Sequence, residues 1–170
     1  MTRPSLPHQL DRTVLIHAEP MTVFAFFQES ERWAGWWGAG STIDPQVGGR
    51  VYIRQPGGAE VVGQVVEIRP PERLVFTYGV QGAPADAASL VTIRLEDAPG
   101  GATRLHLTHE FADRSLRDEH VQGWRYQLAV FANLVADRAL AGAAETVDGW
   151  FAAWSDPNGE TRDATLARIV

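Results

Sequence analysis

The sequence contains neither cysteine nor lysine. Without cysteine there is no disulfide, no thiolate metal site, no thiol nucleophile and no thiol redox switch. All 15 basic residues are arginine, which also excludes Schiff-base catalysis and a phosphate-binding P-loop, because both need lysine. The formal net charge is −6 and no basic cluster is present. The chain is therefore not expected to bind nucleic acid, since phosphate contacts supply most of that affinity.

Long apolar runs are also missing. No segment approaches the roughly 20 apolar residues that a membrane-spanning helix needs, and the opening MTRPSLPHQLDR has no apolar stretch typical of a signal peptide. We therefore expect a cytoplasmic protein without membrane insertion. A chain of 170 residues predicts one domain of ordinary size with a short appendage. Such a chain buries enough surface to need no structural metal.

Apolar and polar residues alternate between Gly48 and Tyr78, and glycine or proline pairs interrupt this segment three times. The pattern is typical of consecutive antiparallel strands with one buried face. Together with its flanking segments it predicts six strands, at residues 13–18, 43–55, 59–68, 74–78, 89–96 and 103–111. Two short helices, at 20–27 and 31–37, are expected between the first two strands.

The apolar period changes near residue 116. Spacings of 3, 4, 3 and 4 positions separate the apolar residues Val121, Trp124, Leu128, Phe131 and Val135. They predict a long amphipathic helix over about 116–140, with Ser115 and Asp118 as a capping box and Gly142 as the C-terminal cap. The order of elements gives an α+β fold, with a curved six-stranded antiparallel sheet wrapped around the long helix.

Four motifs between Arg32 and Trp124, within a resemblance that covers about residues 12–141, narrow this prediction. In chain order they are Arg32-Trp33 with Trp36-Trp37-Gly38, then Val47-Gly48-Gly49-Arg50, then Gly63-Gln64-Val65-Val66-Glu67 followed by Pro70-Pro71-Glu72-Arg73-Leu74-Val75-Phe76-Thr77-Tyr78, and last Leu107-Thr108-His109 leading to His120-x-x-Gly123-Trp124. Together they resemble the AHSA-like family, named for the activator of the Hsp-90 chaperone ATPase, within the SRPBCC (START, or birch-pollen-allergen-like) superfamily. The resemblance implies the helix-grip fold, no common catalytic triad, and a cavity between helix and sheet for an apolar small molecule.

Inward positions of the strands and apolar faces of the helices supply the residues expected to line that cavity. They are Phe26, Trp37, Val62, Gln64, Phe76, Tyr78, Ile93, Leu107, His109, Trp124, Leu128 and Phe131. Alternation along 103–111 turns His109 inward and His106 outward. A buried imidazole needs a hydrogen-bond partner, for which Tyr78 and Gln64 are candidates. His109 is then either a satisfied core histidine or a polar anchor for a ligand.

The aromatic residues near the two short helices also have two interpretations. Trp33, Trp37 and Trp124 either form the mouth of the cavity or pack in the core, which large aromatic side chains commonly dominate. His120 lies one helical turn before Trp124 and is expected on the domain surface or against the short helices.

No catalytic residue, metal site or cofactor is predicted. The motif G-x-S-x-G is absent, and Gly38-Ala39-Gly40 lacks the third glycine of a dinucleotide-binding loop. No pair of carboxylates suggests acid–base catalysis. His106 and His109 point to opposite faces of one strand, so they cannot share a metal ion.

Residues 143–170 extend beyond the expected domain at 1–142. Val147, Trp150, Phe151 and Trp154 predict an apolar helical face, followed by a turn at 156–159 and a second short helix. The segment resembles the opening helices of a SnoaL-like (NTF2-like) domain. Either the chain is a shortened two-domain protein, or the extra helix packs on the domain or on a second subunit as a homodimer, because such a face should not stay in water.

Three functions follow from these observations. The first is a non-enzymatic module that binds an apolar or aromatic small molecule, and it is favoured because no catalytic set is predicted. The second is a chaperone-type partner of an Hsp-90 protein, as the family name suggests, which would need a charged docking face. The third is a cyclase- or hydrolase-like enzyme that uses His109 or Tyr78 for acid–base chemistry, as distant members of the superfamily do.

Overall fold

The computed structural model describes residues 6–83 and 88–155, with side chains up to Gly149. The chain divides into two units, Met1–Val135 and Ala136–Val170. The boundary between the units lies inside the last helix. The sequence predicted the end of the domain later, at residue 142. The candidate site lies entirely in the first unit.

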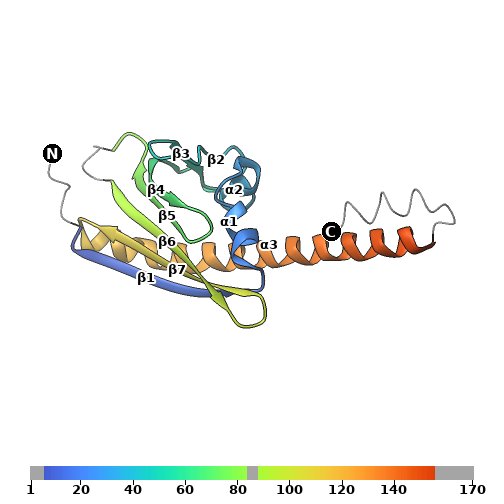
Figure 1. The fold of residues 1–170 in the computed structure, drawn as a ribbon. Coiled ribbons are helices and arrows are strands. Elements are labelled where there is room, and N and C mark those ends of the chain that lie inside the picture. The colour runs from blue at the N-terminus through green and yellow to red at the C-terminus, as the bar shows by residue number, and fades with distance from the viewer. Residues whose placement is uncertain (1–5, 84–87, 156–170) are drawn as a thin grey trace. The chain divides into compact units, whose positions relative to one another are not determined.

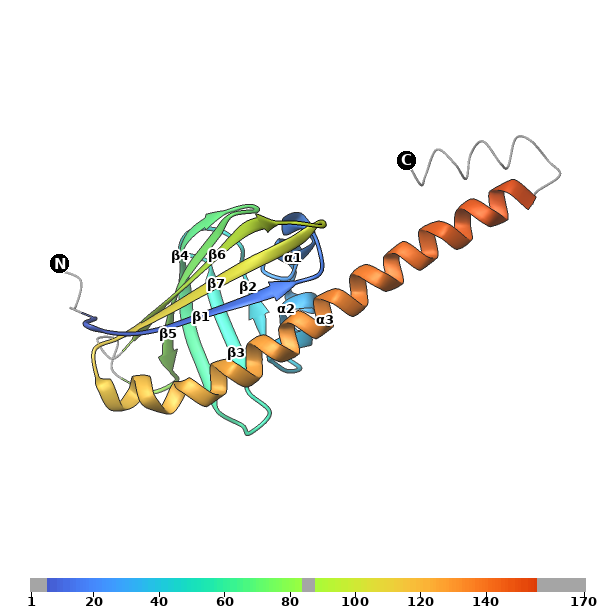
Figure 2. The same ribbon diagram turned by 90° about the horizontal axis from the view of Figure 1, so that it is seen from below.

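The described residues form one antiparallel sheet in the order β1-β7-β6-β5-β4-β3-β2, together with three helices (Figure 1). The strands are β1 (His8–Ile16), β2 (Thr42–Ile43), β3 (Arg50–Arg54), β4 (Glu60–Arg69), β5 (Arg73–Val80), β6 (Ser89–Ala98) and β7 (Ala102–Phe111). The helices are α1 (Pro20–Ala25), α2 (Ser30–Trp37) and α3 (Arg114–Ser155). In Figure 2 the strands curve on one side and the first part of α3 runs along the other. The predicted helix-grip architecture is confirmed.

The sheet has seven strands, one more than the sequence predicted. The expected single strand at 43–55 is a hairpin of β2 and β3, because the chain reverses at Gly48 and Gly49. Gly48 has a φ of 83°, which favours glycine. A Cβ on Gly49 would lie 2.1 Å from the carbonyl oxygen of Asp44. The glycine pair, interpreted from sequence as a bend or bulge, therefore makes a tight turn.

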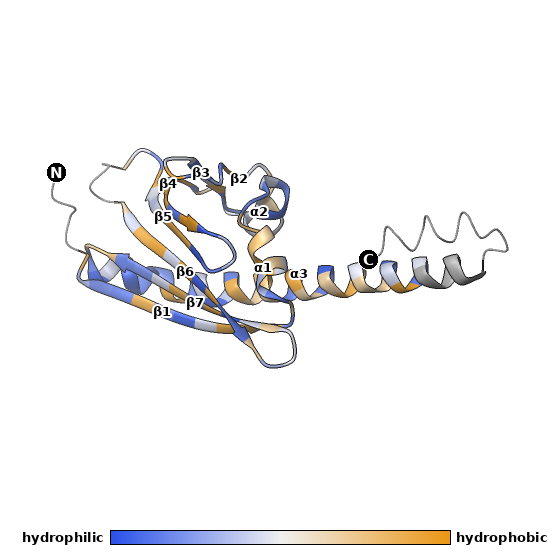
Figure 3. Cartoon of the chain, in the orientation of Figure 1, coloured by the Kyte–Doolittle hydropathy of each residue, from blue (hydrophilic) through white to orange (hydrophobic). Residues whose placement is uncertain are grey.

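Aromatic side chains fill the space between the inner face of the sheet and the helices. The rings of Phe27 and Phe131 stack with centroids 5.3 Å apart, and Trp33 meets Phe76 edge-on at 5.8 Å. These four side chains are fully buried. Polar and apolar residues alternate along the strands, as the colours of Figure 3 show. The interior that a helix-grip fold offers to a ligand is largely occupied by the protein itself.

Helix α3 begins earlier than expected because Asp113 caps it. One carboxylate oxygen of Asp113 accepts hydrogen bonds from the backbone N–H groups of Ser115 (2.6 Å) and Leu116 (3.3 Å) and from the Ser115 hydroxyl (2.8 Å). The Ser115 hydroxyl bond leads the effects that lower the pKa of Asp113. The predicted capping box of Ser115 and Asp118 is therefore wrong, since Ser115 already lies inside the helix.

Helix α3 also ends later than expected, because it continues through Gly142 to Ser155. Alanines, the strongest helix formers, flank Gly142 and offset its weak helix propensity. Within the described residues, no helix is long and apolar enough to cross a membrane.

The described part of the second unit consists of the C-terminal half of α3. Leu140 and Val147 are exposed there. The rest of the predicted apolar face belongs to residues whose side chains are not described. The predicted turn at 156–159 and the helix after it also lie outside the described residues.

Gly63 allows β4 to approach β5 closely, next to a register shift between Val65 and Glu67. A Cβ at Gly63 would lie 1.7 Å from the backbone oxygen of Thr77. We expect Gly63→Ala to lower the free energy of unfolding by about 2 kcal/mol or more, measured by urea denaturation. Gly57→Ala is the control, because a Cβ there meets nothing within 4 Å. Equal effects of the two substitutions would contradict this role.

Candidate functional site

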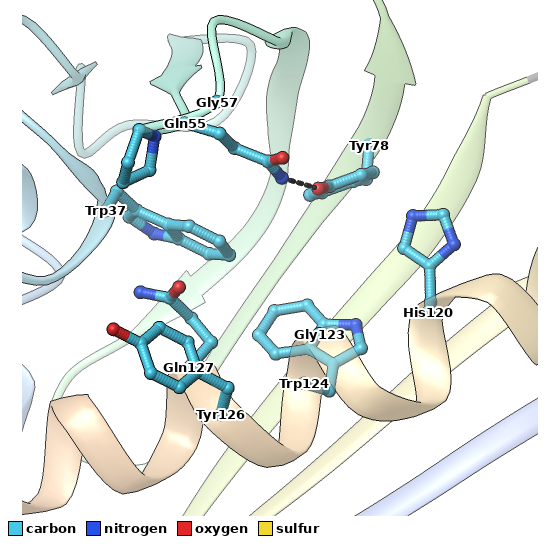
Figure 4. A pocket seen from close by; sticks show the side chains of 10 residues that line it. Trp37, Gln55, Gly57, Tyr78, His120, Gly123, Trp124, Tyr126 and Gln127 are labelled. Atoms are coloured by element: carbon cyan, nitrogen blue, oxygen red, sulfur yellow. Dashed lines mark hydrogen bonds between the residues drawn. The ribbon is translucent and has the colours of Figure 1, made fainter.

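A pocket of about 340 Å³, partly open to solvent, lies where α3 faces the end of α2 and the turn between β3 and β4 (Figure 4). Residues from four parts of the chain line it: Trp37 from α2; Gln55, Pro56 and Gly57 from the turn; Tyr78 from β5; and His120, Gly123, Trp124, Tyr126 and Gln127 from α3. Segments far apart in sequence therefore converge on one site.

Aromatic rings form most of the wall of this pocket. Trp37 and Trp124 meet edge-on with centroids 5.4 Å apart, and Tyr78 lies 6.5 Å from Trp37 and 6.4 Å from Trp124. These three side chains are at least 95% buried, whereas Tyr126 is 70% exposed. The pocket thus has a fixed aromatic floor and an exposed tyrosine at its rim.

Tyr78 and Gln55 form a polar pair in the wall. The side-chain amide of Gln55 donates a hydrogen bond of 3.0 Å to the Tyr78 hydroxyl. Burial raises the pKa of Tyr78 to about 12, against the opposing effect of the Gln55 bond. The phenol therefore keeps its proton at physiological pH and acts as a hydrogen-bond donor or acceptor, not as a base.

His109 lies behind the pocket in a chain of hydrogen bonds. The indole N–H of Trp124 can only donate, so Nδ1 of His109 accepts at 2.8 Å. The proton is then on Nε2, which donates to the Ser89 hydroxyl at 2.6 Å, and Ser89 donates to the backbone carbonyl of Tyr78 at 2.8 Å. Burial, reinforced by nearby His120, lowers the pKa of His109 to about 2. His109 is neutral with both nitrogens engaged, which supports the core-histidine interpretation.

The partners expected for His109 from the sequence were wrong. They are Ser89 and Trp124, not the Tyr78 hydroxyl or Gln64. Gln64 and Val62 lie on the outer face of β4, although both were predicted to face the cavity. Valines occupy positions 61, 62, 65 and 66, so hydrophobicity alone fits either phase of the strand.

The remaining predicted lining residues separate into two groups. Trp37, Tyr78 and Trp124 line the pocket. The others are buried in the core without lining it: Phe26, Phe76, Ile93, Leu107, His109, Leu128 and Phe131.

Sequence reasoning missed the polar and small residues of the pocket. His120, expected at the surface or against the short helices, is half-buried, and its ring lies 5.6 Å from Tyr78 and 5.0 Å from Phe111. Its Nδ1–H donates to the Leu116 carbonyl at 2.7 Å, so a neutral His120 carries a lone pair on Nε2. One signal was available, because His120, Gly123 and Gln127 share a face of α3 by helical spacing.

Among the residues that the structure describes, the site has neither a metal-binding cluster nor a permanently charged side chain in its wall. Across the described parts of the chain, no group of three or more His, Asp or Glu residues could hold a metal ion. None of the described residues that line the pocket is Asp, Glu or Arg. The arrangement is suited to stacking and hydrogen bonding with an uncharged molecule.

The buried state of His109 predicts a specific pH dependence of stability. Below the ordinary histidine pKa of about 6.5, the unfolded chain binds a proton that the folded chain, with its pKa of about 2, does not. The free energy of unfolding should therefore fall as the pH drops below about 6.5, by up to about 1.4 kcal/mol per pH unit. Above that pH, His109 should contribute no dependence.

Urea denaturation at about pH 7.5 and about pH 5.5 tests this expectation. His109→Gln should lower the stability at both values but flatten its pH dependence. His17→Gln, at an exposed position, should leave the dependence as in the wild type. A slope in His109→Gln as steep as in the wild type would show that another group is responsible.

Several solved structures have a fold similar to that of this chain. Protein MLL2253 from Mesorhizobium loti superposes with a TM-score of 0.67 at 20% identity, over 77% of this chain and 98% of that one. The Aha1 dimer from Colwellia psychrerythraea superposes with a TM-score of 0.67 at 14% identity, over 76% of this chain and 96% of that one. PFC0360w, an HSP90 activator from Plasmodium falciparum, superposes with a TM-score of 0.53 at 22% identity, over 62% of this chain and 74% of that one. These identities establish a shared fold alone.

Comparison of sequences gives the family. No curated protein matches the chain. The family model described as Activator of Hsp90 ATPase homolog 1-like protein matches residues 17–136, which is well over half of the chain and includes every residue that lines the pocket. This chain therefore belongs to the family of Activator of Hsp90 ATPase homolog 1-like proteins.

Proposed function

We propose that the protein binds a small, neutral, aromatic molecule in the pocket beside Trp37 and Trp124. The observation that carries the proposal is an aromatic-walled pocket of about 340 Å³. This volume is at the lower end of the roughly 300–1,000 Å³ typical of ligand sites. Edge-to-face and offset contacts with fixed aromatic rings favour a planar ligand.

The electrostatics of the wall support a ligand without formal charge. Taking an ion out of water into a site without a charged partner is costly. The chain has 36 charged residues in all, 15 basic and 21 acidic, yet none of the described lining residues belongs to them. A carboxylate or phosphate ligand would have no counter-charge among the described residues of this wall.

The two groups considered for acid–base catalysis support binding over chemistry. His109 has both ring nitrogens engaged in hydrogen bonds, and its low pKa of about 2 keeps it neutral. The pKa of about 12 keeps Tyr78 protonated. Neither group is matched to proton transfer near neutral pH, where a catalytic pKa would be most effective.

Activation of an Hsp90-type chaperone is a second candidate, favoured by the family to which the chain belongs. One structural relative is described as an HSP90 activator. The test is the ATPase rate of a purified Hsp90-type chaperone with and without this protein. A rate that does not change at saturating protein would count against this candidate and leave the aromatic-binding proposal untouched.

Filling the pocket from Gly123 tests the first proposal. A Cβ at Gly123 meets no atom within 4 Å, and leucine has a better helix propensity than glycine. We expect Gly123→Leu to fold normally and to weaken binding of the neutral dye N-phenyl-1-naphthylamine by about tenfold or more, because the new side chain occupies the dye's volume. Dye fluorescence measures the affinity, and circular dichroism confirms the fold.

The matched control is Gly142→Leu, in the same helix but not among the residues that line the pocket. It should bind the dye as the wild type does. Dye binding that survives in Gly123→Leu, or that is absent from the wild type, would overturn the proposal.

A further inference from the structure

We propose that the Tyr78–Gln55 pair recognises a hydroxyl group on the bound aromatic ring, so that the ligands of this protein are neutral hydroxyarenes such as phenols and naphthols. The inference rests on the proposed aromatic-binding function and adds the chemical group that the site selects.

The hydrogen bonds of the pair are incomplete. The Tyr78 hydroxyl accepts a bond from the Gln55 amide, and its own proton has no acceptor among the described residues. The Gln55 side-chain oxygen likewise accepts no bond from them. If the amide is turned over, Tyr78 donates to Gln55 and the amide N–H groups become the unused donors. In both orientations the pair keeps an unused donor beside an unused acceptor.

The unused donor and acceptor of the pair matter because Tyr78 is buried. Tyr78 is only 5% exposed, so its hydroxyl, which has one partner in Gln55, has little access to water for a second hydrogen bond. An aromatic ring that fills the pocket also displaces the water that would otherwise satisfy the pair. A ligand that replaces those bonds is therefore favoured over one of equal shape that does not.

A hydroxyl group matches both unused positions at once, because it donates one hydrogen bond and accepts others. A ketone or an ether only accepts, and a methyl group does neither. Nε2 of Gln55 lies 3.0 Å from the Tyr78 hydroxyl oxygen and Oε1 belongs to the same amide group, so the unused donor and the unused acceptor are neighbours. The pair therefore favours a hydroxyl over a carbonyl, ether or methyl substituent of an aromatic ring.

The surroundings of the pair favour the neutral form of that hydroxyl. Figure 4 shows the pair beside Trp37, with Trp124 and His120 on the α3 side. No described lining residue is a permanent cation, so a phenolate would be buried without a counter-charge. Binding should weaken when the pH rises above the pKa of the ligand's own hydroxyl, about 10 for a phenol.

Two probes of nearly equal shape test the proposal on the full chain. Equilibrium dialysis measures the affinities of 2-naphthol and 2-methylnaphthalene for the wild type, Tyr78→Phe and Tyr52→Phe. The ratio of the two affinities should shift against 2-naphthol by about tenfold in Tyr78→Phe, which corresponds to about 1.4 kcal/mol. Tyr52→Phe removes a hydroxyl that donates to Glu60 outside the pocket, and it should leave the ratio unchanged.

A second variant covers the case in which Tyr78→Phe fails to fold. Gln55→Met, in a partly exposed turn, should shift the ratio in the same direction. If both probes bind but neither variant changes the ratio, hydroxyl recognition is overturned and the aromatic-binding function stands. If neither probe binds the wild type, both proposals fail.

Discussion

The hydrogen bond from the Trp124 indole to His109 fixes how the long helix lies on the sheet. Apolar contacts are non-directional and would tolerate small rotations of α3. The hydrogen bond to the buried imidazole restricts them, since Nδ1 of His109 has to meet the one N–H that the indole offers. Through Ser89 the same chain of bonds reaches the Tyr78 carbonyl, so α3, β7, β6 and β5 are joined. With Trp124 held against the sheet, the helical spacing brings His120, Gly123 and Gln127 to the pocket.

Periodicity was sufficient to predict the fold because it follows from burial of one face per element. The strand containing His109 and the helix containing Trp124 were predicted with the correct faces, and the motifs identified the family. The predictions that failed depended on contacts between particular residues, which the spacing of apolar residues does not reveal. The phase of β4 was wrong because valines stand on both of its faces. The helix start was wrong because the capping interaction of Asp113 depends on the backbone geometry of the preceding turn.

The site was predictable only where it coincides with the core. Trp37, Tyr78 and Trp124 were found because large aromatic residues at regular spacing predict burial. Gln55 was missed, since the sequence placed it at the end of an expected strand, whereas it follows β3 in a turn and its partner Tyr78 is 23 residues away in sequence. Gly123 was quoted only as part of a family motif, because the lack of a side chain gives no hydrophobic signal. A glycine contributes to a pocket through the space that its missing side chain leaves. That space can be recognised only when the positions of the surrounding residues are known.

The packing also determines where the described residues leave open space. Four aromatic rings contact one another between the helices and the sheet: those of Phe26, Phe27, Trp36 and Phe131. The interior therefore has little room for a ligand. Space remains at the end of α2, where Gly57 and Gly123 bring no side chains. Tyr78 links the two regions, because its backbone carbonyl ends the chain of bonds from Trp124 while its hydroxyl meets Gln55 in the pocket wall. Both ends of Tyr78 are therefore held by hydrogen bonds, which would preorganise its hydroxyl for the proposed ligand.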